Sequence, residues 1–319
     1  MKSSGKGFLE AGVGLVLGAF VGLTGYALLD LIMRVGMDRE EPRLLKGLEG
    51  RISGARGGPE YAAALRAAMA EQDGRETEEV SITARDGVRL AGHWVPAEHP
   101  RRVILAVHGW RGGWTQAFGM MADWLREAGC SVLYVDQRGT GESEGDYIAF
   151  GLLERLDCAD WLAFLADRFP HMPLYLFGMS MGAASALMAA GEPLPAQLRG
   201  IIADSAFTSP KAILEHVAKH NLHLPGARGA EAIFRRKLGL DPDSCTTTEA
   251  LKRCSVPVLL IHGLRDRFVP PDMAYANYRA CAGPKHLFTV PGADHVGSWF
   301  TDPEGYRRAL TGFWEKYDE

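Results

Sequence analysis

The chain has 319 residues, of which 47% are apolar and 23% charged, and its formal net charge is −4. This balance is typical of a globular protein with a sizeable core, and the acidic charge gives no reason to expect nucleic acid as a partner. The cysteines lack the CxxC or CxxH spacing of a zinc knuckle and do not resemble a disulfide scaffold. They are Cys130, Cys158, Cys245, Cys254 and Cys281.

An apolar segment comes first in the chain. Residues 11–29 contain no charged residue and are bounded by Glu10 and Asp30. A helix of that length covers roughly the ~30 Å of a bilayer core, so we expect residues 1–33 to form a single-pass N-terminal membrane anchor. A cleavable signal peptide is the main alternative and a buried soluble helix the second, but no small-x-small cleavage site follows the apolar run.

Small residues and flanking charges add two expectations about this anchor. Gly14, Gly18 and Gly22 share one helix face, which would let a second copy of the helix approach closely, although glycine is also simply common in membrane helices. Lys and Arg residues are more numerous after the segment than before it, which favours a cytoplasmic catalytic domain. Residues 34–78 are predicted to form a connector, which contains a glycine-rich break and a short alanine-rich helix.

From residue 79 the pattern changes to alternating strands and helices. A β-hairpin is predicted over 79–84 and 88–96, and the later apolar runs are typical of strands that are covered on both faces. Repeated strand–helix–strand units imply an α/β fold with a mostly parallel, eight-stranded sheet between two layers of helices. The other strands are expected at 102–109, 131–139, 174–178, 200–207, 257–263 and 286–292, and helices at 117–129, 152–169, 181–191 and 303–317.

One serine lies where a strand is predicted to turn into a helix. The stretch GMSMG places Ser180 between Gly178 and Gly182 after an apolar strand and before an alanine-rich helix. Such a Gly-x-Ser-x-Gly turn is sharp and strained, and glycine at both flanks removes side chains that would collide there. The pattern therefore predicts an exposed nucleophilic serine.

A serine nucleophile needs a base and an acid that orients the base. Asp266 follows the strand PVLLIHG, and His295 follows the strand HLFTVPG, so the chain order is Ser180, Asp266, His295. This is the order of an α/β-hydrolase triad. Asp294 competes with Asp266 for the role of the acid, whereas His262 lies inside a strand motif and is predicted to be structural.

An oxyanion hole needs at least two hydrogen-bond donors. The backbone N–H of Met181, the residue after the nucleophile, is one candidate. The backbone N–H of Trp110, in the glycine-rich loop after RVILAVHG, is the other. The neighbouring Arg111 would either meet an anionic substrate or lie in solvent.

The motifs HGW, DQRGTGESEG, GMSMG, HGLRDRFVP and GADH resemble those of the α/β-hydrolase superfamily over roughly residues 79–317. Within it, the chain is similar to membrane-anchored bacterial hydrolases related to the Bem46-like proteins, and to the serine aminopeptidase and monoacylglycerol-lipase-like group. The resemblance implies an α/β-hydrolase domain over 79–319. It also implies that Asp136 and Arg138, in the motif DQRGTGES, stabilise a structural turn.

The resemblance also implies a variable lid between the sixth and seventh strands, here about 207–251. The insertion is short, with two predicted helices at 210–220 and 229–239, and suggests an accessible pocket for modest acyl chains. His216 and His220 have the spacing of metal ligands, but no HExxH or HxxEH motif supports a metal site. We therefore expect no metal and no organic cofactor.

The expected activity is that of a serine hydrolase that cleaves a small acyl ester or thioester through an acyl-enzyme intermediate. A peptidase or amidase on the same triad is the first alternative. An aminopeptidase would need an acidic lid group for the substrate amine, and Glu215 and Glu231 are the candidates. A membrane-tethered binding protein without catalysis is the second alternative, and it is disfavoured because the triad motifs are complete.

Overall fold

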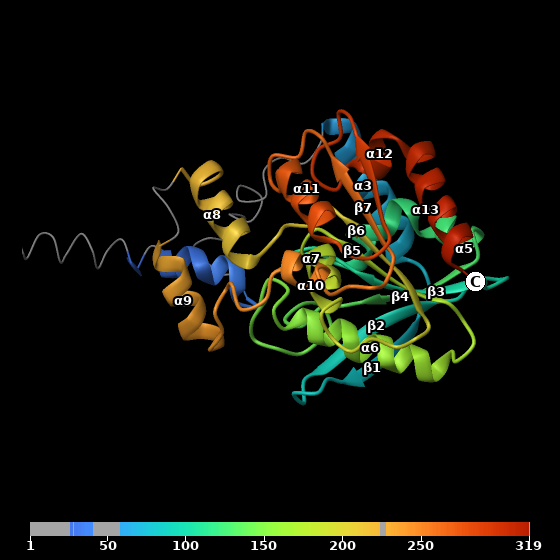
Figure 1. Cartoon of the computed structure of the whole chain (residues 1–319), viewed down its shortest axis with the longest axis horizontal. Helices are drawn as coiled ribbons and strands as arrows, with labels where there is room; N and C mark the ends of the chain where they lie inside the picture. The colour runs from blue at the N-terminus through green and yellow to red at the C-terminus, as the bar shows by residue number, and fades with distance from the viewer. Residues whose placement is uncertain (1–25, 28, 41–57, 224–227, 319) are drawn as a thin grey trace, which may run out of the picture.

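The computed structural model describes residues 26–27, 29–40, 58–223 and 228–318. Its centre is one sheet of eight strands in the order β1-β2-β4-β3-β5-β6-β7-β8 (Figure 1). Strand β2 is antiparallel to both β1 and β4, and the other neighbours are parallel, which confirms the predicted sheet. The strands are β1 (Glu78–Thr83), β2 (Arg89–Val95), β3 (Arg102–Val107), β4 (Cys130–Val135), β5 (Leu174–Met179), β6 (Leu198–Asp204), β7 (Val258–Gly263) and β8 (Lys285–Val290).

Helices cover both faces of the sheet, because the central strands are apolar on both sides. In β3, Leu105 packs in the apolar layer formed with α6 and α7, whereas Ile104 packs in the opposite layer with α5 and α13. The helices of the domain are α3 (Pro59–Asp73), α4 (Trp114–Phe118), α5 (Ala122–Glu127), α6 (Glu154–Arg168), α7 (Met181–Ala189), α8 (Pro210–His220), α9 (Arg228–Leu238), α10 (Thr247–Leu251), α11 (Pro271–Ala280), α12 (Ser298–Thr301) and α13 (Pro303–Tyr317).

The helix predicted over 117–129 is interrupted in the structure. Helix α4 ends at Phe118, a 3₁₀ turn covers Gly119–Met121, and α5 follows. Helix α3 crosses at this point, and a Cβ on Gly119 would lie 3.5 Å from the backbone of Ala68. The sequence alone does not predict this interruption, because it depends on a helix about fifty residues earlier in the chain.

Residues 29–37 form a helix ahead of the hydrolase domain, and Met33, Val35 and Met37 are buried. The two methionines join an apolar cluster with residues of the lid helices α8 and α9, beside which the helix lies in Figure 1. The anchor predicted over 11–29 lies almost wholly outside the described residues and stays a prediction. Within the part of the chain that the structure describes, no helix has the length and apolarity needed to cross a membrane.

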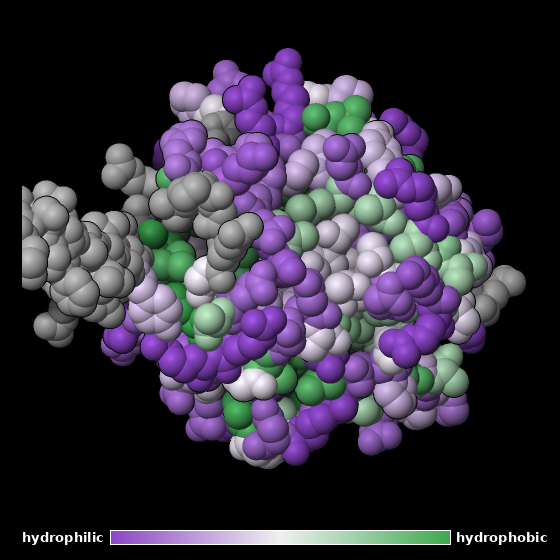
Figure 2. Space-filling view, turned by 60° about the vertical axis from the view of Figure 1, so that its left-hand side comes forward, coloured by the Kyte–Doolittle hydropathy of each residue, from purple (hydrophilic) through white to green (hydrophobic). Residues whose placement is uncertain are grey.

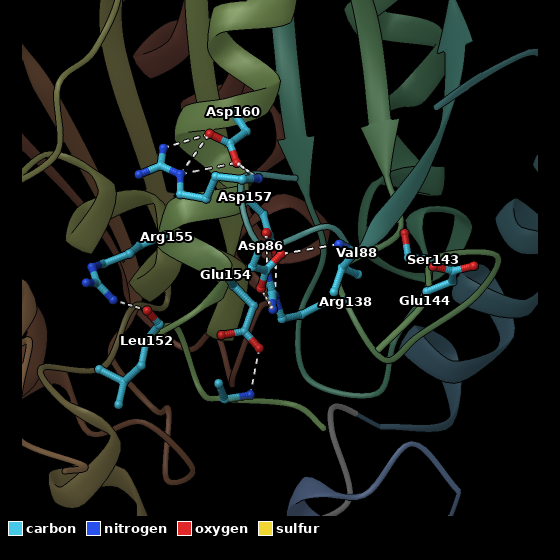
Figure 3. Close-up of polar contacts among 12 residues, drawn as sticks. Asp86, Val88, Arg138, Ser143, Glu144, Leu152, Glu154, Arg155, Asp157 and Asp160 are labelled. Carbon is cyan, nitrogen blue, oxygen red and sulfur yellow. Dashed lines mark hydrogen bonds and ion pairs between the residues drawn. The ribbon is translucent and has the colours of Figure 1, made fainter. Parts of the chain in front are cut away.

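The loop after β4 is held by buried charges (Figure 3). Arg138 donates two hydrogen bonds to the carboxylate of Asp157, at 2.7 and 2.5 Å, and a third to Asp86 at 2.9 Å. Burial raises the pKa of Asp157 to about 6, although Arg138 lowers it. Asp136 accepts a hydrogen bond from the backbone N–H of Glu142 at 2.9 Å. Both Asp136 and Arg138 therefore stabilise the loop, in agreement with the resemblance.

A second buried cation lies at the start of β3, at the end of the parallel strands opposite to the loop after β4. Arg102 is 3% exposed, and its guanidinium stacks 4.5 Å from the ring centroid of Trp314 in α13. It donates two hydrogen bonds to Asp318, at 3.2 and 2.6 Å, and Tyr175 in β5 donates a third at 2.9 Å. The end of α13 is thereby fixed to two neighbouring strands.

Candidate active site

Ser180 occupies a strained turn between β5 and α7. Its backbone has φ 54° and ψ −116°, a conformation that non-glycine residues adopt rarely. A Cβ on Gly178 would overlap the backbone of Gly182, and a Cβ on Gly182 would overlap the carbonyl of Val107. Gly178 is therefore required by the close approach of the end of β5 to the first turn of α7, and Gly182 by the packing of that turn against the end of β3.

The structure brings the three predicted triad residues together. Ser180 Oγ lies 2.8 Å from His295 Nε2, and His295 Nδ1 lies 2.7 Å from Asp266 Oδ2. Asp266 follows β7 and His295 follows β8, at the carboxyl edge of the sheet. The exposed fractions of Ser180, Asp266 and His295 are 4%, 3% and 3%. The prediction of an exposed serine was therefore wrong: Ser180 is buried, and it is reached only through the cavities that it lines.

The surroundings of Asp266 favour its ionised form. Burial alone would raise its pKa, but the charge and hydrogen bond of His295 and the backbone N–H of Val269 together hold that pKa below its usual value. The Asp266 Oδ1 atom accepts hydrogen bonds from the N–H groups of Phe268 and Val269, at 2.9 and 2.8 Å. The competing carboxylate, Asp294, is exposed.

His262 packs behind the acid, in line with its predicted structural role. Its side chain is fully buried, its Nε2 donates to the carbonyl of Val269 at 2.9 Å, and the same nitrogen is 3.4 Å from Asp266 Oδ2. Burial lowers the pKa of His262, which favours the neutral ring. It therefore supports the loop that carries Asp266 without competing for the proton of His295.

A network that the sequence analysis missed supports the loop of His295. Ser205, at φ 62°, donates to Asp204 at 2.9 Å and accepts a hydrogen bond from the N–H of Val296 at 3.2 Å. Tyr306 of α13 donates to the other oxygen of Asp204 at 2.9 Å. Burial raises the pKa of Asp204 to about 7. The only sequence signal was a polar pair, Asp204-Ser205, at the end of an apolar strand.

The candidate oxyanion donors flank Ser180. Met181 is the first residue of α7, so its backbone N–H and the positive end of the helix dipole face the serine. Trp110 follows β3, and both residues line the same cavity as Ser180. In the described part of the chain, neither backbone N–H has an acceptor, so both are available to a ligand. The side chain of Arg111 does not line either cavity; it is half-buried and donates to the carbonyl of Val35 at 2.6 Å.

Two cavities meet at Ser180. The larger has a volume of about 740 Å³ and an almost entirely apolar lining, which includes Phe207, Ile213 of α8 and Phe268. In Figure 2, which turns this side of the molecule toward the viewer, hydrophobic residues lie between hydrophilic ones. The second cavity, about 570 Å³, has a more polar lining that includes Gln116.

The described residues of the lid contribute neither a cluster of metal ligands nor an acidic side chain to the cavities. The rings of His216 and His220 stack at 4.5 Å, and His216 donates to the carbonyl of Arg267 at 2.9 Å. No three His, Cys, Asp or Glu side chains among the described residues are grouped as metal ligands. Glu215 is exposed, and Glu231 pairs with basic side chains; neither lines the cavities at Ser180.

The family model of the S33 serine aminopeptidases matches residues 98–242. Among solved structures, the Pyrococcus furiosus esterase Pf2001 has a TM-score of 0.63 and 22% identity, covering 78% of this chain and 94% of its own. The Pyrococcus horikoshii acylaminoacyl peptidase has a TM-score of 0.58 and 18% identity, covering 79% of this chain and 44% of its own. With the sheet order, these matches show the α/β-hydrolase fold, and they support a protein of the serine-hydrolase type.

Two relatives define the family more narrowly. The uncharacterized protein YfhR of Escherichia coli O157:H7 is 30% identical over 244 residues, which cover 74% of this chain and 80% of YfhR. The uncharacterized protein Rv2307c of Mycobacterium tuberculosis H37Rv is 32% identical over 229 residues, which cover 71% and 73% of the two chains. The chain therefore belongs to the family of YfhR within the α/β-hydrolases.

Proposed function

We propose that this chain is a serine hydrolase that cleaves carboxylic esters or thioesters through an acyl-enzyme intermediate. The observation that carries the proposal is the unbroken series of hydrogen bonds from Ser180 through His295 to Asp266, which opens on an apolar cavity. A nucleophile, a base and an orienting carboxylate in hydrogen-bond contact are what acyl transfer requires.

In the proposed acylation step, His295 Nε2 takes the proton of Ser180 Oγ, and the oxygen attacks the carbonyl carbon of the substrate. The N–H groups of Trp110 and Met181 then stabilise the oxyanion. Asp266 keeps the proton on His295 Nδ1, so that Nε2 is free to act as the base. When the tetrahedral intermediate collapses, His295 gives the proton to the leaving alcohol or thiol, and the acyl group stays on Ser180.

The second half of the reaction repeats these roles with water. His295 takes a proton from a water molecule, the hydroxide attacks the acyl-enzyme, and Ser180 leaves with the proton. We assign the acyl group to the larger cavity, because its apolar lining offers no partner to a polar leaving group. The leaving group then lies in the second cavity, beside Gln116 and Val296, next to the proton donor.

The first test is covalent labelling of the full chain with a fluorophosphonate, whose phosphorus is attacked by an activated serine with loss of fluoride. We expect the native chain to label, and Ser180→Ala and His295→Ala to stay unlabelled. The matched control, Ser81→Ala on the exposed side of β1, should label normally. Ester turnover should fall on the order of 10⁶-fold in either active-site variant. A folded native chain that neither labels nor hydrolyses any ester would refute the proposal and favour a non-catalytic binding role.

A peptidase or amidase on the same residues is the alternative that the family model names. We favour an ester, because neither Glu215 nor Glu231 lines the cavities where a substrate amine would be bound. Rates on matched acyl p-nitrophenyl esters and acyl p-nitroanilides separate the two activities. Faster cleavage of an aminoacyl anilide than of the ester would overturn the ester assignment.

Membrane attachment through residues 11–29, a cytoplasmic catalytic domain and self-association through Gly14, Gly18 and Gly22 are proposed from the sequence alone. The uncharged apolar run supports the first, and the excess of Lys and Arg after it supports the second. Fractionation of cells that produce the full chain, followed by alkaline extraction, tests attachment. Recovery in the soluble fraction would contradict it.

A further inference from the structure

One face of the helix formed by residues 29–37 borders the larger cavity. Leu29, Ile32, Met33 and Gly36 line this cavity, and their spacing of three and four residues places them on a single helix face. Met33 is buried against the lid cluster, whereas the other three are half-buried. One wall of the cavity thus comes from a segment that precedes the hydrolase domain.

The C-terminal turn of the same helix holds the loop that carries Trp110. The indole Nε1 of Trp110 donates to the carbonyl of Gly36 at 2.8 Å, and Arg111 Nε donates to the carbonyl of Val35 at 2.6 Å. Arg111 also donates to the carbonyl of Asp38. The backbone of Arg111 has φ 49°, which is costly for a residue other than glycine. The hydrogen bonds to the helix offset that cost.

The helix is also tied to the lid. Asp30 forms an ion pair with Arg236 of α9, and Lys237 Nζ lies 2.6 Å from Asp38 Oδ1. The Lys237–Asp38 pair is largely buried, with side chains 11% and 25% exposed, so it is screened less than a surface pair. The helix therefore connects α9 on one side to the candidate oxyanion loop on the other.

We propose that the face of this helix formed by Leu29, Ile32, Met33 and Gly36 is an integral part of the active site. On this proposal, which rests on the proposed function, Met33 and its neighbours limit the depth of the acyl cavity and so select the acyl group. Arg111 is a positioning residue that keeps the Trp110 backbone N–H aimed at the oxyanion. The matching substrate carries an uncharged hydrocarbon acyl group, because the cavity lining has no partner for a charge.

The selection of the acyl group is tested with Met33→Trp in the full chain, which places a larger side chain in the cavity. We expect the optimum of kcat/KM in a series of p-nitrophenyl esters, from acetate to palmitate, to move to shorter acyl chains. Each excluded methylene should cost about tenfold or more. Labelling rates with alkyl fluorophosphonates of increasing chain length should move in the same direction, and they need no turnover.

The matched control is Arg34→Trp, which adds the same side chain to the exposed face of the same helix. It should keep the native chain-length profile. An unchanged profile in a folded Met33→Trp variant would overturn the assignment. This result differs from a failure of the proposed function, in which the native chain itself would neither label nor hydrolyse an ester.

The positioning role is tested with Arg111→Gly, which accepts the positive φ but loses the hydrogen bonds to the helix. Since losing an oxyanion donor costs about 10²–10³ in kcat, we expect displacement of the loop to lower kcat about 10–100-fold. KM for a short ester should change little, because Arg111 does not line the cavities, and Arg111→Lys should restore part of kcat. Trp110→Phe, which loses the indole donor and part of the ring that lines the cavities, is the second variant. Native kcat in both Arg111→Gly and Trp110→Phe would overturn the positioning role.

Discussion

Replacement of Asp266 by Asn should remove most of the catalytic activity without unfolding the protein. The Asn oxygen can keep the two backbone hydrogen bonds from Phe268 and Val269, so the loop should hold its shape. The Asn NH₂ group would then face His295 Nδ1, where the carboxylate now accepts a hydrogen bond at 2.7 Å. His295 Nδ1 must then become an acceptor. The ring proton therefore moves to Nε2, where it points at Ser180.

A histidine in this tautomer cannot take the serine proton. The expected loss in kcat is on the order of 10⁴-fold, as for the same change in a serine-protease triad, or about 5 kcal/mol in the activation free energy. The assay is ester hydrolysis together with the rate of fluorophosphonate labelling, and urea unfolding reports whether the fold is kept. Asp294→Asn is the matched control, because this carboxylate is exposed and should be dispensable. A loss below tenfold for Asp266→Asn, or an equal loss for Asp294→Asn, would refute the assignment of the acid.

Three further changes test the packing and the buried charges. Gly182→Ala should destabilise the fold by more than about 4 kcal/mol in urea unfolding, because its Cβ overlaps backbone, whereas Gly312→Ala in the open face of α13 should stabilise it by about 0.5–1 kcal/mol. Arg138→Met should cost about 3–5 kcal/mol, because it leaves Asp157 buried without its cation, and a simultaneous Asp157→Leu change should recover most of that loss. The buried Asp204 binds its proton more tightly in the folded state than in the unfolded state. The contribution of Asp204 to the free energy of unfolding should therefore be greatest below pH 3.8. It should decrease as the pH rises to about 7, by up to about 1.4 kcal/mol per pH unit. Asp204→Asn should remove this pH dependence. If the free energy of unfolding in urea fell in parallel for the native chain and the variant from pH 5 to 8, the pH dependence would not come from Asp204.

The parts of the site that depend on local sequence were predictable. An apolar strand followed by Gly-x-Ser-x-Gly has few other structural explanations, and the structure places Ser180 in that turn. Asp266 and His295 follow predicted strands, and parallel strands bring their carboxyl ends to one edge of the sheet. The eight-stranded sheet was predictable for the same reason, because its apolar runs are longer than those of strands with one solvent face.

The parts that depend on contacts between distant segments were not predictable. The hydrogen bond from Trp110 to Gly36 joins residues 74 positions apart, and nothing in either stretch specifies the other. Hydropathy shows Leu29 at the end of the apolar run and Ile32 and Met33 just beyond it, but it does not indicate that these residues line a cavity at Ser180. In the same way, Arg111 reads as a solvent-exposed loop residue until its carbonyl partners are known.

The pairing of Arg102 with Asp318 has a consequence for how the chain folds as it is synthesised. The two residues are 216 positions apart, so the buried cation at the start of β3 has no carboxylate partner until almost all of the described chain has been made. An unpaired charge inside a sheet is costly, and strand β3 pairs with both β4 and β5 at the centre of the sheet. We therefore expect the nascent sheet to stay loosely packed around the start of β3 until α13 leaves the ribosome. Until then, we expect it to be a substrate for chaperones.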